Sequence, residues 1–214
     1  YKRQIVVSDV MMPLMNGLEL CAKIKNNIEY SHIPVILLTA KVLPEAKVEG
    51  FSYGADAYVE KPFTILQLHM QIRNLLKLRT TFQQHMTSFL PDAKPEEKEE
   101  EETGIQLTPQ DQEFIKKMQE IIEQQLADEG FSIDTLASEM NMSRSNFYRK
   151  LKALSGMPPN DYLKNCRLNK AAQLLKEGYR VTEVFERTGF GSSSYFAKCF
   201  KAKFGVLPKD YISN

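Results

Sequence analysis

The stretch SRSNFYRKLKALSGMPPNDY, residues 143–162, returns at residues 192–211 as SSSYFAKCFKAKFGVLPKDY. Nine of the twenty paired positions are identical: Ser143/Ser192, Ser145/Ser194, Phe147/Phe196, Lys152/Lys201, Ala153/Ala202, Gly156/Gly205, Pro159/Pro208, Asp161/Asp210 and Tyr162/Tyr211. Chance would give about one identity at ordinary residue frequencies. The sequence therefore indicates an internal duplication, and whatever this unit does, the chain does twice.

The first copy has the pattern of two short helices joined by a tight turn. A helix is expected over residues 133–140, a turn at 141–142, and a second helix that Ser143 caps and that ends at Leu154. Small Ala137 lies where the helices would cross, as in a helix-turn-helix. Phe147, Leu151 and Leu154 share the inward face of the second helix, and the outward face carries Arg144, Ser145, Tyr148, Arg149 and Lys152.

The second copy repeats this design with changes. We expect a helix over residues 182–188, a turn at 189–191 that is one residue longer, and a helix over 192–204. Phe196 and Phe200 would face inward. The outward face is smaller and less basic, and it consists of Ser193, Ser194, Ala197, Lys198 and Lys201.

Further helices precede and connect the copies. An amphipathic helix is expected over 111–126, and residues 160–176 are rich in helix formers. A helix of that length spans ~25 Å. With the width of each unit added, it could place two recognition helices in successive major grooves, ~34 Å apart on one face of DNA.

Residues 111–214 resemble the DNA-binding domain of the AraC/XylS family. The resemblance is carried by Gly189-Phe190, Ser194-Tyr195-Phe196, Phe200-Lys201, Phe204-Gly205 and Pro208-Lys209-Asp210-Tyr211, and by Arg167-Leu168 and 171–175 in the connecting helix. It implies double-stranded promoter DNA as the partner. Phe185 departs from the family, which commonly has Ala there, so this side chain should either push the second recognition helix outward or fill a repacked core. The alternative is a helical bundle whose charged faces are only solvated.

The unequal outward faces suggest a division of labour. Arginine can donate two hydrogen bonds to one base, so we expect Arg144 and Arg149 to supply most of the base readout. Lys198 and Lys201 of the second copy would mainly contact phosphates.

The first part of the chain has a different pattern, in which three apolar runs end in polar residues. Residues 5–9 end at Asp9, 34–39 at Thr39, and 57–62 include Lys61. Helical patterns at 17–26, 44–51 and 65–78 alternate with these runs, and residues 79–90 are expected to be a fading helix or a docking arm. Alternating strands and helices predict a parallel α/β sheet whose ligands bind at the carboxyl edge, where the three polar side chains would meet.

A carboxylate, a hydroxyl and an ammonium at one edge suit phosphoryl transfer to the carboxylate. At this point residues 5–63 resemble the receiver domain of response regulators, through 9–17, Leu38-Thr39-Ala40, Tyr58 and Glu60-Lys61-Pro62-Phe63. The resemblance implies a flavodoxin-like fold and a histidine kinase that phosphorylates Asp9. It also implies a Mg²⁺ ion held by Asp9 and the Met11 main-chain carbonyl, and Thr39 and Tyr58 as switch residues beside Lys61.

The sequence departs from the receiver pattern because no strand with an acidic pair precedes Tyr1. Mg²⁺ prefers several oxygen ligands, so we expect an incomplete site with no ion bound in this fragment. The strand at 5–9 would be left with an unpaired edge that either pairs with another chain or is poorly ordered. Acetyl phosphate with Mg²⁺ is accordingly expected to phosphorylate the fragment poorly.

Charge and composition predict three segments. Residues 1–90 form the partial receiver with its C-terminal helix, 91–108 an acidic disordered linker, and 109–214 the duplicated domain. Residues 91–103 carry 2 Lys+Arg against 7 Asp+Glu and no large apolar residue that could be buried in a core. An acidic mimic that competes with DNA is the alternative for this segment. A flexible connection would require control through dimerisation or transient docking, and we expect a homodimer.

The whole pattern predicts a DNA-binding transcriptional regulator that is the output of a two-component phosphorelay. No apolar run approaches the ~20 residues of a membrane span, and three cysteines without metal-like spacing favour a reducing cytoplasm. The wording of residues 30–41 and 54–63 resembles the C-terminal end of Bacteroidetes hybrid two-component systems, whose parent chain includes a kinase and is in some cases anchored in the inner membrane. The alternatives are a phosphotransfer enzyme with a docking module, and a constitutive DNA binder with an inactive receiver.

Overall fold

A computed structural model describes residues 5–40, 53–88 and 107–213 of the chain. The chain divides into two compact units. The first comprises Tyr1–Phe82 with Glu101–Ile115, and the second comprises Gln83–Glu100 with Lys116–Asn214. The segment boundaries expected at residues 90 and 108 stay predictions, because most of the expected acidic linker lies outside the described residues.

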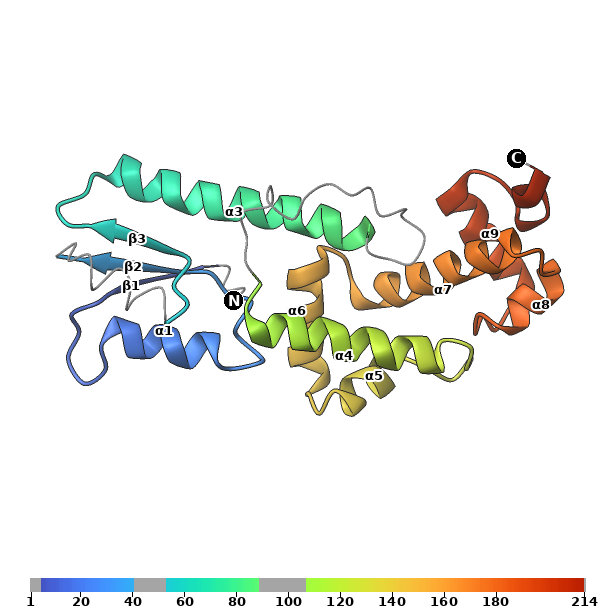
Figure 1. Cartoon of the computed structure of the whole chain (residues 1–214), viewed down its shortest axis with the longest axis horizontal. Coiled ribbons are helices and arrows are strands. Elements are labelled where there is room, and N and C mark those ends of the chain that lie inside the picture. The colour runs from blue at the N-terminus through green and yellow to red at the C-terminus, as the bar shows by residue number, and fades with distance from the viewer. Residues whose placement is uncertain (1–4, 41–52, 89–106, 214) are drawn as a thin grey trace. The chain divides into compact units, whose positions relative to one another are not determined.

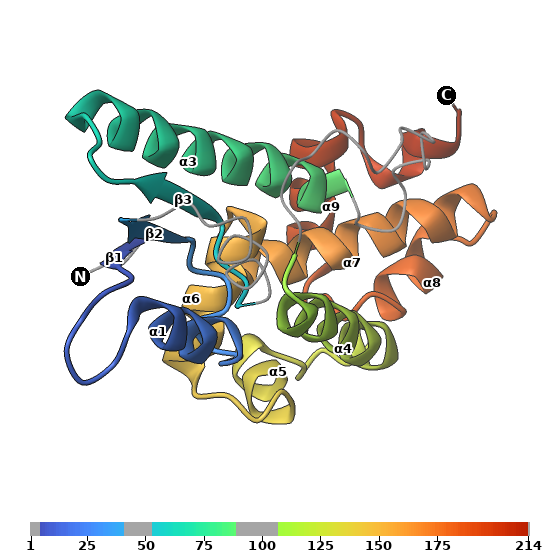
Figure 2. The same cartoon turned by 60° about the vertical axis from the view of Figure 1, so that its left-hand side comes forward.

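The first unit contains a parallel three-stranded sheet of β1 (Val6–Asp9), β2 (Val35–Thr39) and β3 (Ala57–Glu60), in the order β1-β2-β3. Val6 is paired with Val35 in β2, and Ile36 of β2 is paired with Ala57 in β3. Helix α1 (Gly17–Lys25) lies on one face of the sheet and α3 (Ile65–Ser88) on the other, as Figures 1 and 2 both show. This arrangement confirms the predicted α/β class.

The apolar runs of the sequence account for the layers of this unit. Val35, Ile36 and Leu37 of the central strand are fully buried, as expected for a parallel strand covered on both faces. At the β1 edge, Val7 keeps 39% of its surface exposed. The expectation that this edge either pairs with another chain or is poorly ordered stays a prediction.

The helices of this unit follow the predicted pattern at their starts better than at their ends. Asn16 caps α1 by accepting a hydrogen bond from the Glu19 N–H at 2.8 Å. The sequence predicts a helix over 65–78 and a fading helix or a docking arm over 79–90, and α3 continues to Ser88, as the first of these alternatives predicts. Residues 79–88 contain no proline or glycine, so nothing in the sequence ends the helix there. The helix predicted at 44–51 lies outside the described residues.

The duplicated part of the chain is helical. Its elements are α4 (Pro109–Gln125), α5 (Ile133–Glu139), α6 (Arg144–Ser155), α7 (Pro159–Lys176), α8 (Val181–Glu186), α9 (Ser193–Phe204) and the 3₁₀ helix η1 (Pro208–Ser213). Each helix lies within two residues of its predicted range, and the largest shifts are those of α4, which begins two residues before 111, and of α8, which ends two residues before 188. The predicted all-α domain with two helix-turn-helix units is confirmed.

The repeated residues cap the corresponding helix at both of its ends in each copy. The Ser143 hydroxyl accepts a hydrogen bond from the Asn146 N–H, and the Ser192 hydroxyl accepts one from the Tyr195 N–H. At the other end of these helices, Gly156 and Gly205 adopt φ angles of 76° and 81°. Only glycine takes that left-handed conformation without strain, so the repeat preserves both helix caps.

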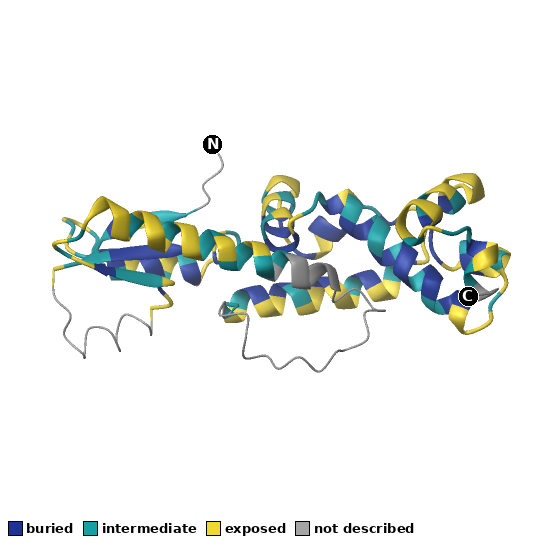
Figure 3. Ribbon diagram, turned by 90° about the horizontal axis from the view of Figure 1, so that it is seen from above, coloured by how far each residue is buried: buried dark blue, intermediate teal, exposed yellow. Residues whose placement is uncertain are grey.

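Figure 3 shows the buried residues as stripes along the helices of the second unit. Leu136, Ala137, Phe147 and Leu151 are buried in the first copy, which confirms the small residue at the helix crossing. In the second copy the cluster includes Val184, Phe190, Phe196 and Phe200 together with residues of α7. The connecting helix α7 contacts helices of both copies, so it forms part of both cores.

Of the two arrangements expected for Phe185, the structure shows the one in which its side chain packs into the core. Its side chain packs against the second cluster, with its ring centroid 6.3 Å from that of Phe196. The phenylalanine therefore belongs to the aromatic core of the second copy.

Candidate functional site

The three polar residues predicted for the sheet edge meet there. Asp9 is the last residue of β1, Thr39 the last of β2, and Lys61 follows β3 directly. The Lys61 N–H donates to the Thr39 carbonyl at 2.7 Å, and the Lys61 ammonium forms an ion pair with Oδ2 of Asp9. Parallel strands place their carboxyl ends at one edge, which is why the sequence could predict this convergence.

The Asp9 carboxylate is ionised and accessible. The hydrogen bond from Lys61 and one from the Met11 N–H, at 3.1 Å to Oδ1, hold the pKa of Asp9 below its ordinary value. About a third of the Asp9 side chain is exposed. An ionised oxygen open to solvent and beside a cation is suited to attack an electrophilic phosphorus atom.

The loop that follows Asp9 folds back tightly on the strand. The Gly17 N–H donates to the Val10 carbonyl at 2.9 Å, and a Cβ atom on Gly17 would lie only 2.2 Å from the Asp9 carbonyl oxygen. Met11, whose carbonyl was expected to contact a metal ion, lies in this loop with an exposed side chain. The glycine thus allows α1 to start beside the carboxylate.

The two expected switch residues lie on neighbouring strands. Tyr58 of β3 is paired with Leu37 of β2 and packs against a buried cluster that includes Cys21 and Ala55. Burial raises the pKa of Tyr58 to about 12, so the phenol stays protonated. Thr39 is half-buried. Their movement on phosphorylation stays a prediction.

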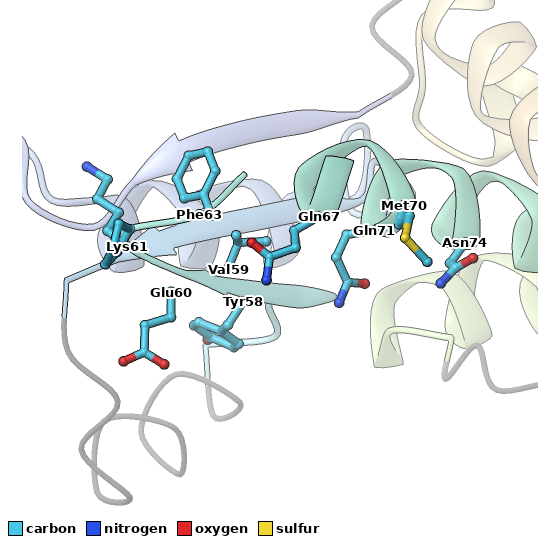
Figure 4. Close-up of a pocket in the computed structure, with 10 residues that line it drawn as sticks. Tyr58, Val59, Glu60, Lys61, Phe63, Gln67, Met70, Gln71 and Asn74 are labelled. Carbon is cyan, nitrogen blue, oxygen red and sulfur yellow. The ribbon is translucent and has the colours of Figure 1, made fainter. Parts of the chain in front are cut away.

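A cavity of about 460 Å³ lies between β3 and α3, and Figure 4 shows the side chains that line it. Glu60 and Lys61 point in opposite directions, as successive residues of an extended strand do. Only Lys61 of these two turns toward the Asp9 edge, where it forms its ion pair. The amide groups of Gln67 and Gln71 face the cavity from α3.

The described residues do not form a complete Mg²⁺ site. In residues 5–40, 53–88 and 107–213, no three His, Cys, Asp or Glu side chains are grouped so that they could hold a metal ion. The expected donors are the Asp9 carboxylate and the Met11 carbonyl, whereas Mg²⁺ requires near-octahedral oxygen coordination. Both oxygens of Asp9 already accept hydrogen bonds from the protein.

The first recognition helix, α6, presents most of its predicted outward residues to solvent. Arg144, Ser145, Arg149 and Lys152 are exposed, whereas Tyr148 is half-buried. Two of the outward side chains are already held in place. Oδ1 of Asp134 in α5 lies 2.8 Å from Nε of Arg144, and the Arg149 guanidinium donates to the Ser145 carbonyl and the Asn146 side chain.

The outward face of the second recognition helix, α9, has smaller and fewer basic side chains than that of α6. Ser193, Ser194, Lys198 and Lys201 are exposed, and Ala197 is half-buried. Tyr195 also lies on the surface, with 52% of its area exposed. The sequence interpretation assigned Tyr195 only to a motif, although its position next to Ser194 near the start of the helix could have marked it as accessible.

Asp134 is the residue that sequence reasoning missed. It stands in the first turn of α5, where an acidic residue is common because it interacts favourably with the helix dipole. Because this role explains the acid by itself, the sequence offered no reason to predict its contact with the first residue of α6. Its sequence distance from Arg144 gives no sign that the turn brings the two side chains together.

The family models agree with both parts of the chain. Residues 1–73 match the response regulator receiver domain, and residues 136–214 match a helix-turn-helix domain. The chain thus combines a response regulator receiver domain with an AraC-type helix-turn-helix domain. Among the described helices, none has the length and apolar character needed to cross a membrane.

Similar proteins match the whole chain or one part of it. A protein of Formosa agariphila named histidine kinase P4 is 36% identical over 208 residues, which is 97% of this chain and 15% of that protein. The response regulator ArlR of Staphylococcus aureus is 42% identical over 73 residues, covering 34% of this chain and 32% of ArlR. The C-terminal domain of the response regulator YesN from Fusobacterium nucleatum is 30% identical, with a TM-score of 0.44, over 47% of this chain and 98% of that domain.

Proposed function

We propose that this chain is the output portion of a phosphorelay, in which phosphorylation of Asp9 controls the binding of two unequal helix-turn-helix units to promoter DNA. The observation that carries the proposal is the joint presence of an ionised Asp9 beside Lys61 and a duplicated unit with an exposed basic helix face. A phosphotransfer enzyme would have no use for the second feature.

In the receiver step, an oxygen of Asp9 attacks the phosphorus of a phosphohistidine on a kinase domain. The O–P bond forms, the P–N bond breaks, and the histidine nitrogen leaves with the electron pair and becomes an imidazole that can take up a proton. Lys61 then moves from its ion pair with Asp9 to a phosphoryl oxygen, and the Thr39 hydroxyl donates to another. Mg²⁺ would neutralise phosphoryl charge in a receiver whose remaining ligands are supplied outside the described residues.

In the DNA step, the two units act differently. Arg144 and Arg149 of α6 read base edges, with Ser145, Tyr148 and Lys152 beside them. Lys198 and Lys201 of α9 contact phosphates, with Ser193, Ser194 and Ala197 allowing close approach to the backbone. The exposed, charged face of α6 and the smaller face of α9 support this assignment.

The proposal also includes the partners, the location and the domain roles for these two steps. A histidine kinase domain, in the same parent polypeptide or a separate one, supplies the phosphoryl group, and a homodimer presents paired helix-turn-helix domains to DNA. The receiver and the DNA-binding domain act in the cytoplasm, where promoter DNA is accessible. Residues 1–90, 91–108 and 109–214 serve as receiver, linker and DNA-binding domain.

A constitutive DNA binder is the second candidate, because the described residues alone do not complete a Mg²⁺ site. A chimera decides between the two candidates. The first half of a characterised receiver, with its acidic pair, is fused ahead of residue 1, and the protein is treated with acetyl phosphate and Mg²⁺. Our proposal predicts that the chimera gains one phosphoryl group and binds DNA more tightly, and that its Asp9→Asn variant does neither. Equal DNA binding with and without phosphorylation would favour the constitutive binder.

A further inference from the structure

The ion pair between Asp134 and Arg144 joins the two helices of the first helix-turn-helix unit. Asp134 lies in the first turn of α5, and Arg144 is the first residue of α6. The pair is formed through Nε of the guanidinium, at 2.8 Å from Oδ1 of Asp134. Both side chains lie at the surface, with 59% of Asp134 and 72% of Arg144 exposed.

The atom that makes this contact decides what the arginine can still do. A guanidinium has five N–H donors in a planar fork, and only one of them belongs to Nε. The contact at Nε leaves the N–H groups of the two terminal nitrogens available for other acceptors. Those nitrogens have the spacing that matches O6 and N7 of guanine in the major groove.

We propose that Asp134 is a specificity-determining residue that positions Arg144 for a guanine. This inference rests on the proposed function, in which α6 enters the major groove. The first residues of a recognition helix are the ones that reach base edges, and Arg144 is in that place. Holding the side chain before DNA arrives reduces the conformational entropy lost on binding. The same carboxylate repels phosphates, so it disfavours contacts of Arg144 with the backbone alone.

A purely structural role predicts something different. Exposed ion pairs contribute little to folding stability, and an acid in the first turn of α5 also interacts favourably with the helix dipole. Loss of either effect would lower the unfolding temperature slightly. Neither would change which base the protein prefers.

The second copy provides an internal comparison. Because its turn is one residue longer, Phe185 corresponds to Ala137 and Thr182 to Asp134, while Ser193 corresponds to Arg144. The acid and the arginine are therefore both absent from these positions of the second copy. This agrees with a second unit that contacts phosphates and does not read bases.

Glu139 offers a matched control, because it lies in the same helix and carries the same charge. It is exposed and accepts a hydrogen bond from the Gln125 side chain at 2.6 Å. Removing Glu139 changes the net charge as much as removing Asp134 does, and it leaves the Arg144 contact in place.

The test uses the full chain and a duplex library with a randomised central segment. Sequences selected by the unmodified protein define the preferred site, and affinities are then measured for that site and for versions with each guanine replaced. Asp134→Ala should lower discrimination at one guanine by about 3- to 10-fold and should not weaken binding to unrelated duplexes. Glu139→Ala should leave discrimination unchanged. In an Arg144→Ala background, Asp134→Ala should have no further effect on discrimination at that guanine.

The outcomes separate the inference from the function on which it rests. If Asp134→Ala and Glu139→Ala discriminate alike while the unmodified protein still prefers one site, Asp134 does not position Arg144. Loss of discrimination by Asp134→Ala in the Arg144→Ala background would overturn it as well. If the unmodified protein selects no preferred sequence, the proposed function itself fails.

Discussion

A Cβ atom on Gly189 would lie 2.4 Å from the carbonyl oxygen of Leu126. Gly189 belongs to the turn of the second helix-turn-helix unit, and Leu126 follows α4, so the turn and this carbonyl pack together without room for a side chain. Arg167 of α7 ties down the same region by donating to the carbonyls of Asp128 and Phe131 at 2.9 and 3.0 Å. The turn of the second helix-turn-helix unit is therefore packed against the chain that follows α4, and a side chain of α7 is hydrogen-bonded to the same region.

Gly189→Ala should destabilise the helical domain, because a main-chain carbonyl cannot move aside as a flexible side chain can. Gly178→Ala is the matched control: Gly178 also has a positive φ, 90° against 65° for Gly189, but no atom lies within 4 Å of its Cβ position. We expect Gly189→Ala to lower the free energy of unfolding by at least about 2 kcal/mol more than the control does, measured by urea denaturation. Equal losses of stability in the two variants would show that the close approach of Gly189 to the Leu126 carbonyl does not determine the effect of the substitution.

The ion pair of buried Lys25 with the more exposed Asp56 should stabilise the α/β unit. Lys25 Nζ lies 2.7 Å from Oδ2 of Asp56 and 3.1 Å from the Ile33 carbonyl, and only 7% of the Lys25 side chain is exposed. Asp56→Ala would leave this buried ammonium without its counter-charge, but the Asp56 side chain is 26% exposed, so solvent screening should keep the cost below the value of about 3–5 kcal/mol for fully buried pairs. Glu60→Ala removes an exposed acid at the opposite end of β3 and should cost about 0.5 kcal/mol or less. Comparable unfolding midpoints for the two variants would contradict the prediction.

The ammonium of Lys61 should set the ionisation of Asp9. Because the pKa of Asp9 is lowered in the folded protein, the ionised form is favoured there, and this contribution to stability is present above the ordinary value of 3.8 and lost as the pH falls through the folded pKa. Lys61→Met should raise the pKa of Asp9 toward its ordinary value, as followed by NMR of its carboxyl carbon. Lys23→Met, which removes an exposed lysine of α1, should leave it unchanged. An unaltered pKa in Lys61→Met would show that another group controls Asp9.

Phe185 should contribute to the stability of the aromatic core in the second helix-turn-helix unit. Its ring packs against the buried cluster and lies near Phe196, so Phe185→Ala should create a partly collapsible cavity and lower the free energy of unfolding by about 1–3 kcal/mol. Thr182→Ala, at an exposed site of the same helix, should change it by about 0.5 kcal/mol or less. Tighter packing and a higher unfolding temperature in Phe185→Ala would mean that the phenylalanine strains the helix crossing.

The sequence predicted those features that depend on repetition and on strand direction. The meeting of Asp9, Thr39 and Lys61 could be predicted because parallel strands end at a common edge. Ser143 could be predicted as a cap, and its counterpart Ser192, expected as the first residue of a helix, proves to be the cap of α9. Features that depend on side-chain rotamers could not be predicted. Phe185 allowed two arrangements until its ring was seen against Phe196. Residues 79–90 likewise allowed a fading helix or a docking arm, and the structure shows that α3 continues to Ser88.

The contact between Asp134 and Arg144 illustrates the same limit. The sequence shows an acid in one helix and a base at the start of the next, and this pattern is compatible with two separately solvated side chains. Only the path of the turn between α5 and α6 decides that they meet, and turn geometry is set by tertiary packing around Ala137 and Phe147.

The salt dependence of DNA binding by two single variants tests the division of labour between the two units most directly. Affinities of the unmodified chain, Arg149→Ala and Lys198→Ala are measured for the selected duplex and a shuffled one over a range of salt concentrations. We predict that Arg149→Ala loses most of the preference for the selected duplex, because a base contact is lost. Lys198→Ala should weaken both duplexes alike and reduce the slope of log affinity against log salt by about 1. An equal loss of sequence preference in both variants would contradict a reading first unit followed by a phosphate-contacting second unit.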